Sequence, residues 1–355
     1  MSEKGTLRTV LSGLGRIAWD YHLPAIKSDS RFELTAVADV MPERVEETKE
    51  HFGIPAGYAS FEKMLEAEKP DLAVIASPTC FHAEQVFAAF KHGADVFCEK
   101  PLAGTYREAQ CIVQEAQRTG RRIMVYQPHR LAPETVTLQK ILNDGILGQV
   151  FMVRRVCADF RRRNDWQALL KFGGGMLNNY GAHFIDQFLY VFGGKFVSVR
   201  GELRNEVTAG DADDVVKALL TNKRNIIFDM EINMASAWPA NEWIVSGNSG
   251  SAIYDSKNRL WRTRFIAANL LPELRMQTGL SAEGRKYPAE SNLPWDEKIY
   301  PLCATQDNLF YDYCYKHFAV GIAPFVPVSD TLEVMHAIEF CRASVSDGAE
   351  FVSVI

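Results

Sequence analysis

The stretch TVLSGLGRIA, residues 9–18, decides the fold of the first part of the chain. An apolar run of strand length enters a GxGxxA turn, and a helix follows. Gly13 permits the tight turn, Gly15 lets a phosphate group approach the backbone, and Ala18 takes the place of a third glycine where the helix packs on the strand. This order of strand, turn and helix is typical of a Rossmann domain that binds a dinucleotide.

The next hundred residues repeat this alternation. The apolar runs, which lack the polar alternation of half-exposed strands, include LTAVADV, LAVIASP, DVFCEK and RIMVYQ. Between them lie helical stretches such as RVEETKEHFG and REAQCIVQEAQRTG, which end in glycine. The pattern predicts a parallel sheet with helices on both faces. We therefore expect an α/β fold whose first domain, residues 1–127, is a doubly wound Rossmann domain.

The pattern changes after residue 127. Longer segments, which read as strands joined by hairpins, include DDVVKALLTN, NIIFDMEINMA and EWIVSGNSGSAIYD. The stretches PETVTLQKILNDGIL and TLEVMHAIEFCRAS have helical spacing, and residues 277–300 read as a long loop. These features predict a second α/β domain, residues 128–355, with a large and mainly antiparallel sheet.

Composition narrows the class of partner. The 355 residues are 47% hydrophobic and 23% charged with a net charge of -5, so the chain has no cationic field for nucleic acid or a membrane surface. No apolar run is long enough to cross a bilayer. The seven cysteines are scattered and form no CxxC pair, which favours a reducing compartment and predicts no metal site. We expect a cytoplasmic protein with a small-molecule partner.

An acidic residue marks the expected cofactor. Asp39 stands at the end of the second strand, where a carboxylate would bind the adenosine ribose hydroxyls; a solvated strand-end acid is the alternative. Val40 and Met41 follow it and offer no arginine for a 2'-phosphate, so NAD is preferred to NADP. Arg16 and Ile17, in the glycine turn, are included in the cofactor site.

The segment ASPTCFHAEQ ends a further parallel strand. Ligands of open α/β sheets lie beyond the carboxyl ends of the strands, so Ser77, Pro78 and Thr79 are expected to border the dinucleotide cleft. His82 begins the following helix. A histidine satisfied within the first helical turn and a cofactor contact are equally good readings of it.

The segment FCEKPLAGT, residues 97–105, places two charges where the next strand reaches the same cleft. Pro101 stops the strand and leaves a cis bond to Lys100 open. An ammonium beside oxidised nicotinamide and apolar walls should have a lowered pKa, which suits proton exchange with a substrate hydroxyl. Glu99 can bind the nicotinamide ribose. The alternative is a surface Glu/Lys pair at a strand end.

The chain resembles the Gfo/Idh/MocA oxidoreductases over essentially its whole length. The resemblance rests on GLGRIA, AVADV, ASPTCFHAEQ, CEKPLAGTYREA, GGGMLNNYGAHFIDQFLYVFG and PVSDTLEVMHAIEFCRAS. It implies a nicotinamide cofactor, reaction at a secondary alcohol of a sugar, cyclitol or glycoside, and an open C-terminal sheet that forms a homo-oligomer interface. By matched position Lys100 is the catalytic lysine and Glu99 the ribose ligand. Gln127 begins QPHR, where Pro128 replaces the family's usual asparagine.

The same resemblance points to MLNNYGAHFIDQ as the second catalytic element. Asn179 and His183 are four residues apart and share a helix face. The family mostly has aspartate at position 179; an asparagine can orient the imidazole but cannot neutralise an imidazolium, so His183 should be the weaker base and Lys100 should do more of the proton work. Asp186 is an alternative partner of the histidine. The glycines at 173–175 would give this helix a tight entry.

Other pocket residues are predicted from position alone. RRRNDW, residues 161–166, could bring a cation or the Trp166 indole over a sugar, or form a solvated basic loop. Arg130 and Tyr180, with Tyr126, are further candidates for the substrate pocket. FYDYCYKHF has aromatic residues at helical spacing, which favours core packing.

These features predict hydride transfer between a sugar ring carbon and NAD, with Lys100 and His183 relaying the hydroxyl proton. A glucose-like pyranoside or a cyclitol is the expected substrate, and C3 of a glucoside is the specific candidate for the carbon oxidised. Two alternatives stay open. One is a glycosidase or lyase that reduces its NAD again within each turnover, and the other is a regulator that binds NAD without catalysis.

Overall fold

The computed structural model describes residues 5–271, 273, 276, 278, 293–304, 308–346 and 352–353. Its N-terminal domain is built on a parallel sheet with the strand order β3-β2-β1-β4-β5-β6. The strands are β1 (Leu7–Ser12), β2 (Phe32–Ala38), β3 (Ala56–Tyr58), β4 (Leu72–Ile75), β5 (Asp95–Cys98) and β6 (Ile123–Val125). The order reverses between β1 and β4, and such a reversal opens a crevice for ligands. The predicted Rossmann fold is confirmed.

Helices pack on this sheet in two hydrophobic clusters. They are α1 (Leu23–Ser28), α2 (Pro42–Phe52), α3 (Phe61–Glu68), α4 (His82–Lys91) and α5 (Tyr106–Thr119). Helices α2 and α5 end at Gly53 and Gly120, both in the left-handed conformation that their sequences predicted. The short β3 has no apolar run and is absent from the strands predicted above, and the strand before Glu99 is β5.

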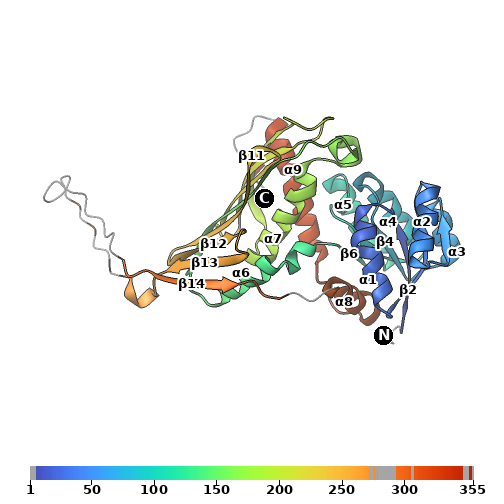
Figure 1. Ribbon diagram of the computed structural model, residues 1–355, viewed down its shortest axis with the longest axis horizontal. Coiled ribbons are helices and arrows are strands. Elements are labelled where there is room, and N and C mark those ends of the chain that lie inside the picture. Colours follow the sequence, from blue (N-terminus) through green and yellow to red (C-terminus); the bar gives the residue numbers. More distant parts are fainter. Residues whose placement is uncertain are drawn as a thin grey trace.

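The chain returns to the N-terminal domain near its end. Helix α8 (Leu309–Tyr315) buries Phe310 and Tyr311 against the Rossmann sheet, which confirms the predicted core role of this aromatic segment. Helix α9 (Val328–Ser346) then lies between the two domains (Figure 1). Its Ile338 packs in the C-terminal core, whereas Met335 packs in the core of the N-terminal domain. The two domains are therefore joined by shared hydrophobic packing.

The C-terminal domain contains a sheet with the order β14-β13-β12-β11-β7-β10-β9-β8-β15. Its strands are β7 (Val150–Phe160), β8 (Phe196–Arg204), β9 (Val215–Asn222), β10 (Ile227–Asn233), β11 (Ala235–Gly247), β12 (Gly250–Asp255), β13 (Leu260–Phe265), β14 (Asp296–Pro301) and β15 (Val352–Ser353). Every pair is antiparallel except β7 with β10. The predicted antiparallel character is confirmed. The loop predicted at 277–300 is wrong at its C-terminal end, where residues 296–300 belong to β14 and pair with β13, and most of the rest falls outside the described residues.

The helices that the structure describes on this sheet pack on one of its faces. Residues of α6 (Pro133–Asn143), α7 (Ala182–Phe192) and α9 form one hydrophobic core with alternate strand residues. The strand residues between them point to the other face, and four large apolar ones are 36–56% exposed: Leu219, Ile227, Ile253 and Ile299. This open face, defined by these four residues, is interleaved with ion pairs such as Arg154 with Asp229.

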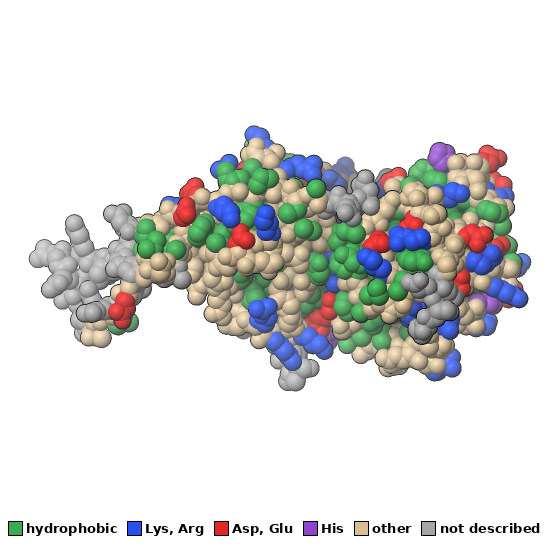
Figure 2. Space-filling model, turned by 90° about the horizontal axis from the view of Figure 1, so that it is seen from below, with side chains coloured by type: hydrophobic (Ala, Val, Ile, Leu, Met, Phe, Trp, Pro, Cys, Tyr) green, Lys and Arg blue, Asp and Glu red, His purple; other side chains and the backbone are tan. Residues whose placement is uncertain are grey.

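The described surface carries charges of both signs. On the face seen in Figure 2, acidic and basic side chains are intermingled over the N-terminal lobe. This agrees with the small net charge of -5. Among the helices that the structure describes, none combines the length and the apolar character needed to traverse a bilayer.

Candidate active site

The carboxyl ends of the Rossmann strands face a cavity of about 200 Å³ that the C-terminal domain closes from the other side. The structure brings together nine of the residues predicted for the site. They are Arg16, Ile17, Ser77, Thr79, Glu99, Lys100, Trp166, Asn179 and His183. Tyr126 and Pro128 also line this cavity. Residues from both domains thus converge on the crevice that the strand order creates.

The glycine turn has room for a pyrophosphate. Gly13 has a φ of +89°, and a Cβ on it would lie 2.4 Å from the backbone nitrogen of Ser77, so only glycine fits between β1 and β4. A Cβ on Gly15 would meet nothing within 4 Å, which leaves open space in front of the turn. Asp39 accepts a hydrogen bond from the backbone N–H of Leu14 at 2.7 Å. The acid therefore stands beside the turn, as a ribose ligand must.

The end of β4 is held by His82. Its ring nitrogens lie 2.8 Å from the carbonyl oxygen of Ser77 and 2.9 Å from that of Pro101. Burial lowers the pKa of His82, and the ring does not line the cavity. Pro78 directly precedes the 3₁₀ turn Thr79–Phe81. His82 is thus a link between two strand ends, which matches the reading of it as a satisfied histidine.

Lys100 extends from the end of β5 to the C-terminal domain. Its Nζ donates to the backbone oxygen and to Oδ1 of Asn179, both at 2.9 Å. Burial lowers the pKa of Lys100 to about 8; the negative charge of Glu99 opposes this shift, and the positive charge of Arg16 adds to it. The Lys100–Pro101 bond is cis, as the sequence allowed. The amine can therefore give and take a proton near neutral pH.

The Glu99 carboxylate is held by contacts with His22 and with the backbone of Lys100. Its Oε1 lies 3.1 Å from Nε2 of His22, whose Nδ1 lies 2.8 Å from the hydroxyl of Tyr311. Its Oε2 accepts from the backbone N–H of Lys100 at 3.1 Å. The carboxylate is 7% exposed and lines the cavity. It is oriented before any ligand arrives.

His183 lies on α7 and faces the same cavity. Its Nδ1 donates to Oε1 of Gln127 at 3.2 Å, which leaves Nε2 as the basic nitrogen. The ring stacks on His129, with centroids 4.0 Å apart and planes 9° apart. Burial, with the nearby charge of Lys100 as a smaller cause, lowers the pKa of His183 well below its usual value. His183 is therefore a neutral hydrogen-bond partner and a weak base.

Two predicted partnerships of His183 are wrong. Asn179 does not orient the imidazole, because its oxygens accept from Lys100 and its Nδ2 donates to Oε1 of Gln167 at 3.3 Å. Asp186 is fully buried and takes two hydrogen bonds from Arg130, at 2.6 and 2.8 Å. Asn179 lies in the π-helical turn Leu177–Gly181 and His183 in α7; both line the cavity, but the hydrogen bonds of the Asn179 side chain go to Lys100 and Gln167.

Arg130 is not a pocket residue, contrary to prediction. It is 1% exposed, pairs with Asp186 and Asp330, and lines no cavity described here. Its place is inside the molecule, where it joins the end of β6 to α7 and α9. Tyr180 lines two neighbouring cavities instead of the first one, whereas Trp166, 39% exposed, lies at the first cavity.

Three residues that contribute to the site were not predicted from the sequence. His129 and Gln167 each lie beside a residue that was noticed, but neither had a signal of its own. His22 belongs to the π-helical turn after GLGRIA and reaches Glu99 only in the folded chain. Burial lowers the pKa of His129 to about 4, with the charge of Arg155 as the second cause.

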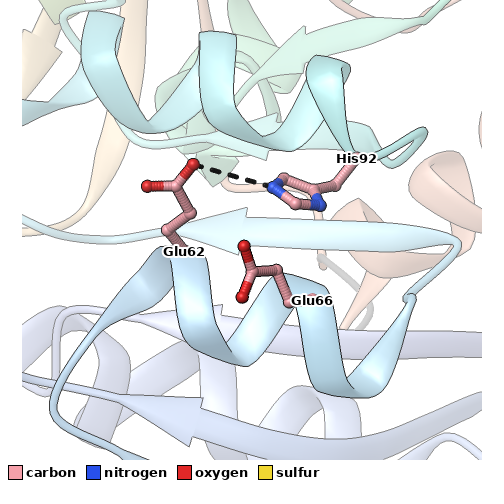
Figure 3. Close-up of side chains that lie close together, drawn as sticks. All are labelled: Glu62, Glu66 and His92. Atoms are coloured by element: carbon pink, nitrogen blue, oxygen red, sulfur yellow. Dashed lines mark ion pairs between the residues drawn. The ribbon is translucent and has the colours of Figure 1, made fainter.

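A separate group of possible metal ligands lies on the Rossmann domain. Figure 3 shows Glu62 and Glu66 on α3 facing His92 at the end of α4. Nε2 of His92 lies 3.8 Å from Glu62, and Nζ of Lys91 is closer to the same carboxylate, at 3.0 Å. Both glutamates are exposed. Because a lysine already neutralises Glu62, we assign no metal here.

Comparisons with known proteins agree with this geometry. Residues 7–127 match the GFO_IDH_MocA model, described as an oxidoreductase family with an NAD-binding Rossmann fold, and residues 135–253 match the GFO/IDH/MocA C-terminal domain. The D-glucoside 3-dehydrogenase of Escherichia coli is 29% identical over 190 residues, 53% of this chain and 54% of that protein. An inositol 2-dehydrogenase/D-chiro-inositol 3-dehydrogenase of Lactiplantibacillus plantarum is 28% identical over 155 residues, 43% and 44% of the two chains. These matches span about half the length of these curated relatives.

Solved structures extend the likeness over the whole fold. An NAD-binding protein from Listeria innocua superposes with a TM-score of 0.84 at 22% identity and covers 99% of this chain and 100% of its own. The WlbA dehydrogenase from Bordetella pertussis, in complex with NADH and UDP-GlcNAcA, gives 0.77 at 20% identity, with 99% of each chain covered. At these identities the likeness shows the fold.

Proposed function

The chain belongs to the GFO/IDH/MocA oxidoreductases, and from that premise we propose that it is an NAD-dependent dehydrogenase or reductase acting on a secondary alcohol of a sugar, glycoside or cyclitol. One observation carries the proposal. The Lys100 amine and the His183 imidazole line the same cavity as Arg16 and Ile17 of the glycine turn. The two candidate acid–base groups therefore lie in the same cavity as the proposed dinucleotide site.

The residues present fit NAD. Gly13 allows the tight turn, Gly15 leaves space in front of it, Asp39 stands beside it, and Glu99 faces the cavity from the end of β5. Val40, which follows Asp39, is 85% exposed and supplies no cation for a 2'-phosphate. When bound, NAD⁺ supplies the acceptor for the hydride that leaves the carbinol carbon.

The chain's own part in the reaction is to manage the proton. As the alcohol becomes a ketone, the neutral Nζ of Lys100 accepts the hydroxyl proton, and the two oxygens of Asn179 hold the resulting ammonium. Nε2 of His183 can accept a hydrogen bond from a neighbouring hydroxyl of the substrate and so orient the ring. Because the pKa of His183 is far below its usual value, Lys100 is the main base.

Substrate class follows from shape and from the relatives. The cavities beside His183 are wide enough for a ring, and two related proteins are named for glucosides and inositols. Cyclic polyols are therefore the first compounds to test, and oxidation at C3 of a glucoside is the first specific reaction.

A single assay tests this proposal. The purified protein is given NAD⁺ and a panel of sugars, glycosides and inositols, and both reduced nicotinamide and products are followed. Stoichiometric formation of NADH and a ketone supports the dehydrogenase. Cleavage of a glycoside without net NADH would instead identify a glycosidase that recycles its cofactor, and NAD binding without turnover of any compound would identify a regulator.

Two further properties belong to this proposal. The open face of the C-terminal sheet, with its four exposed aliphatic residues, supports a homo-oligomer formed through that face. All seven cysteines are free thiols, which supports a reducing, cytoplasmic location.

A further inference from the structure

A second cavity, with a volume of about 300 Å³, adjoins the cofactor cleft and shares Arg16, Asn179 and His183 with it. His183, Asn179 and Tyr180 form one wall of it, and Arg161 and Arg163 of the RRRNDW loop form another. Arg16 reaches it from the glycine turn. No aspartate or glutamate is among the described residues that line it. A pocket lined by three cations and no acid favours an anionic ligand over a neutral sugar.

The partners of these arginines leave much of their charge available. Arg161 is 62% exposed at its side chain and pairs through Nε with Asp159 at 2.6 Å. Arg163 bonds to the neutral amide of Gln167, and its nearest carboxylate, Asp165, is 3.8 Å away. Guanidinium groups have five N–H donors, and these contacts occupy few of them. Both side chains can take a further anionic acceptor.

An adjoining cavity of about 450 Å³ adds a fourth cation together with two carboxylates, Glu134 and Asp159, so the excess of positive charge lies in the second cavity. It shares Arg161 and Tyr180 with the second cavity and is also lined by Arg155. Arg155 is 6% exposed, and no carboxylate of the described residues lies within ion-pair distance of it. Its NH1 donates to Oδ1 of Asn241, while its Nε has no hydrogen-bond partner in the described structure. The rings of Phe184 and Trp243, with centroids 4.4 and 5.4 Å from its Cζ, stabilise this buried cation, and its unbonded Nε leaves one donor for a further acceptor.

Resting on the function proposed above, we infer that the substrate carries an anionic group, a carboxylate or a phosphate, which Arg161 and Arg163 bind while the reacting alcohol lies against Lys100 and His183. These two arginines are absent from the lining of the cofactor cleft, so their charge is not needed for the pyrophosphate of NAD. Arg16 lines both cavities and can serve either anion. The substrate class is therefore a sugar acid or a sugar phosphate.

Equilibrium binding to the protein–NADH complex tests this without requiring turnover. Calorimetry compares D-glucuronate and glucose 6-phosphate with glucose and methyl glucoside at low and high salt. At least one anion should bind about tenfold or more tightly than the neutral sugars, with a difference that shrinks as salt rises. Tighter binding of D-glucuronate indicates a carboxylate site, and tighter binding of glucose 6-phosphate indicates a phosphate site.

The RRR triplet contains its own control. Arg163→Gln and Arg161→Gln should each weaken anion binding about tenfold or more and leave NADH binding unchanged. Arg162→Gln should change neither, because Arg162 is exposed, bonds to the carbonyl of Val207 and lines neither cavity.

The outcomes separate the two proposals. Failure of both anions to bind, or equal losses in the Arg162 variant, overturns the anionic substrate. Turnover of neutral sugars with no preference for an anion also overturns the anionic substrate, but it is consistent with the proposed oxidoreductase function. If anion binding depends on Arg163 but no compound is turned over, the anion site is supported and the proposed oxidoreductase function is contradicted.

Discussion

Nζ of Lys100 lies against the two oxygens of Asn179, which are neutral acceptors. The neighbouring carboxylate, Glu99, binds the lysine's backbone N–H and His22 instead. Burial therefore has no bonded anion to oppose it at the ammonium, and the pKa of Lys100 falls to about 8. An asparagine at position 179 leaves the ammonium without a carboxylate partner there.

The pH dependence of the reaction tests this view. Oxidation needs the neutral amine, so its rate should be low below pH 8, rise through about pH 8 and level off above it. An Asn179→Asp variant would put a carboxylate against Nζ, raise the lysine pKa and displace the rise upward by about 1 to 3 pH units. Rates measured across pH for the two proteins give the comparison.

Asn178→Asp is the matched control for that experiment. It adds the same charge in the same turn, but Oδ1 of Asn178 accepts from Arg342 and not from Lys100. Its profile should stay closer to that of the unmodified protein. Equal displacement in both variants would show that Asn179 has no special relation to the lysine.

At the scale of elements, the loop 173–175 decides how the second domain meets the first. A Cβ on Gly173 would lie 2.7 Å from the Cβ of Thr79, so the loop packs directly on the end of β4. Gly175 has a φ of +102°, and a Cβ there would lie 2.4 Å from Oδ1 of Asp213. Asp213 also accepts from the N–H of Leu177 at the start of the π-helical turn.

Gly175→Ala should therefore destabilise both the fold and the site. The left-handed backbone and the clash together should lower the free energy of unfolding by about 2 kcal/mol or more. Gly145→Ala is the control, because Gly145 has a φ of +72° but open space around its Cβ position, so only the backbone cost of about 1 kcal/mol applies. Urea unfolding of both variants measures the difference, and equal losses would contradict the packing argument.

The sequence predicted most of these elements because their signals are local. Apolar runs and terminal glycines predicted β1, β2, α2 and α5, and hairpin-like segments predicted β10 to β12. β3 has only three residues and no apolar run, so periodicity could not reveal it. The π-helical turn Leu177–Gly181 was also invisible, and with it the reason why Asn179 faces Lys100.

At the scale of the whole molecule, the candidate site depends on contacts between distant parts of the chain. Lys100 and Asn179 are 79 positions apart, and Glu99 and His22 are 77. The sequence predicted Lys100 and His183 because each stands in a recognisable motif. It could not predict His22, His129 or the burial of Arg130, because their partners are fixed only by the folding of both domains together.

The open face of the C-terminal sheet makes a prediction at the same scale. Replacing both Ile253 and Ile299 by lysine should dissociate the expected homo-oligomer, because paired cations would have to be buried in the interface. Sedimentation should show the smaller species without loss of helix or strand content. Phe87→Lys, which changes a 36% exposed residue of α4, should leave the assembly intact. If the unmodified protein sediments as a monomer, the proposed interface is contradicted.

The most direct test of the account is the Lys100→Met variant, assayed for NADH formation and, separately, for NADH binding. The methionine keeps an unbranched apolar side chain of nearly the same length but has no amine to accept a proton. We predict a loss of turnover of about 10²-fold or more, with NADH bound as in the unmodified protein. A variant that turns over at the original rate would contradict the role of this amine.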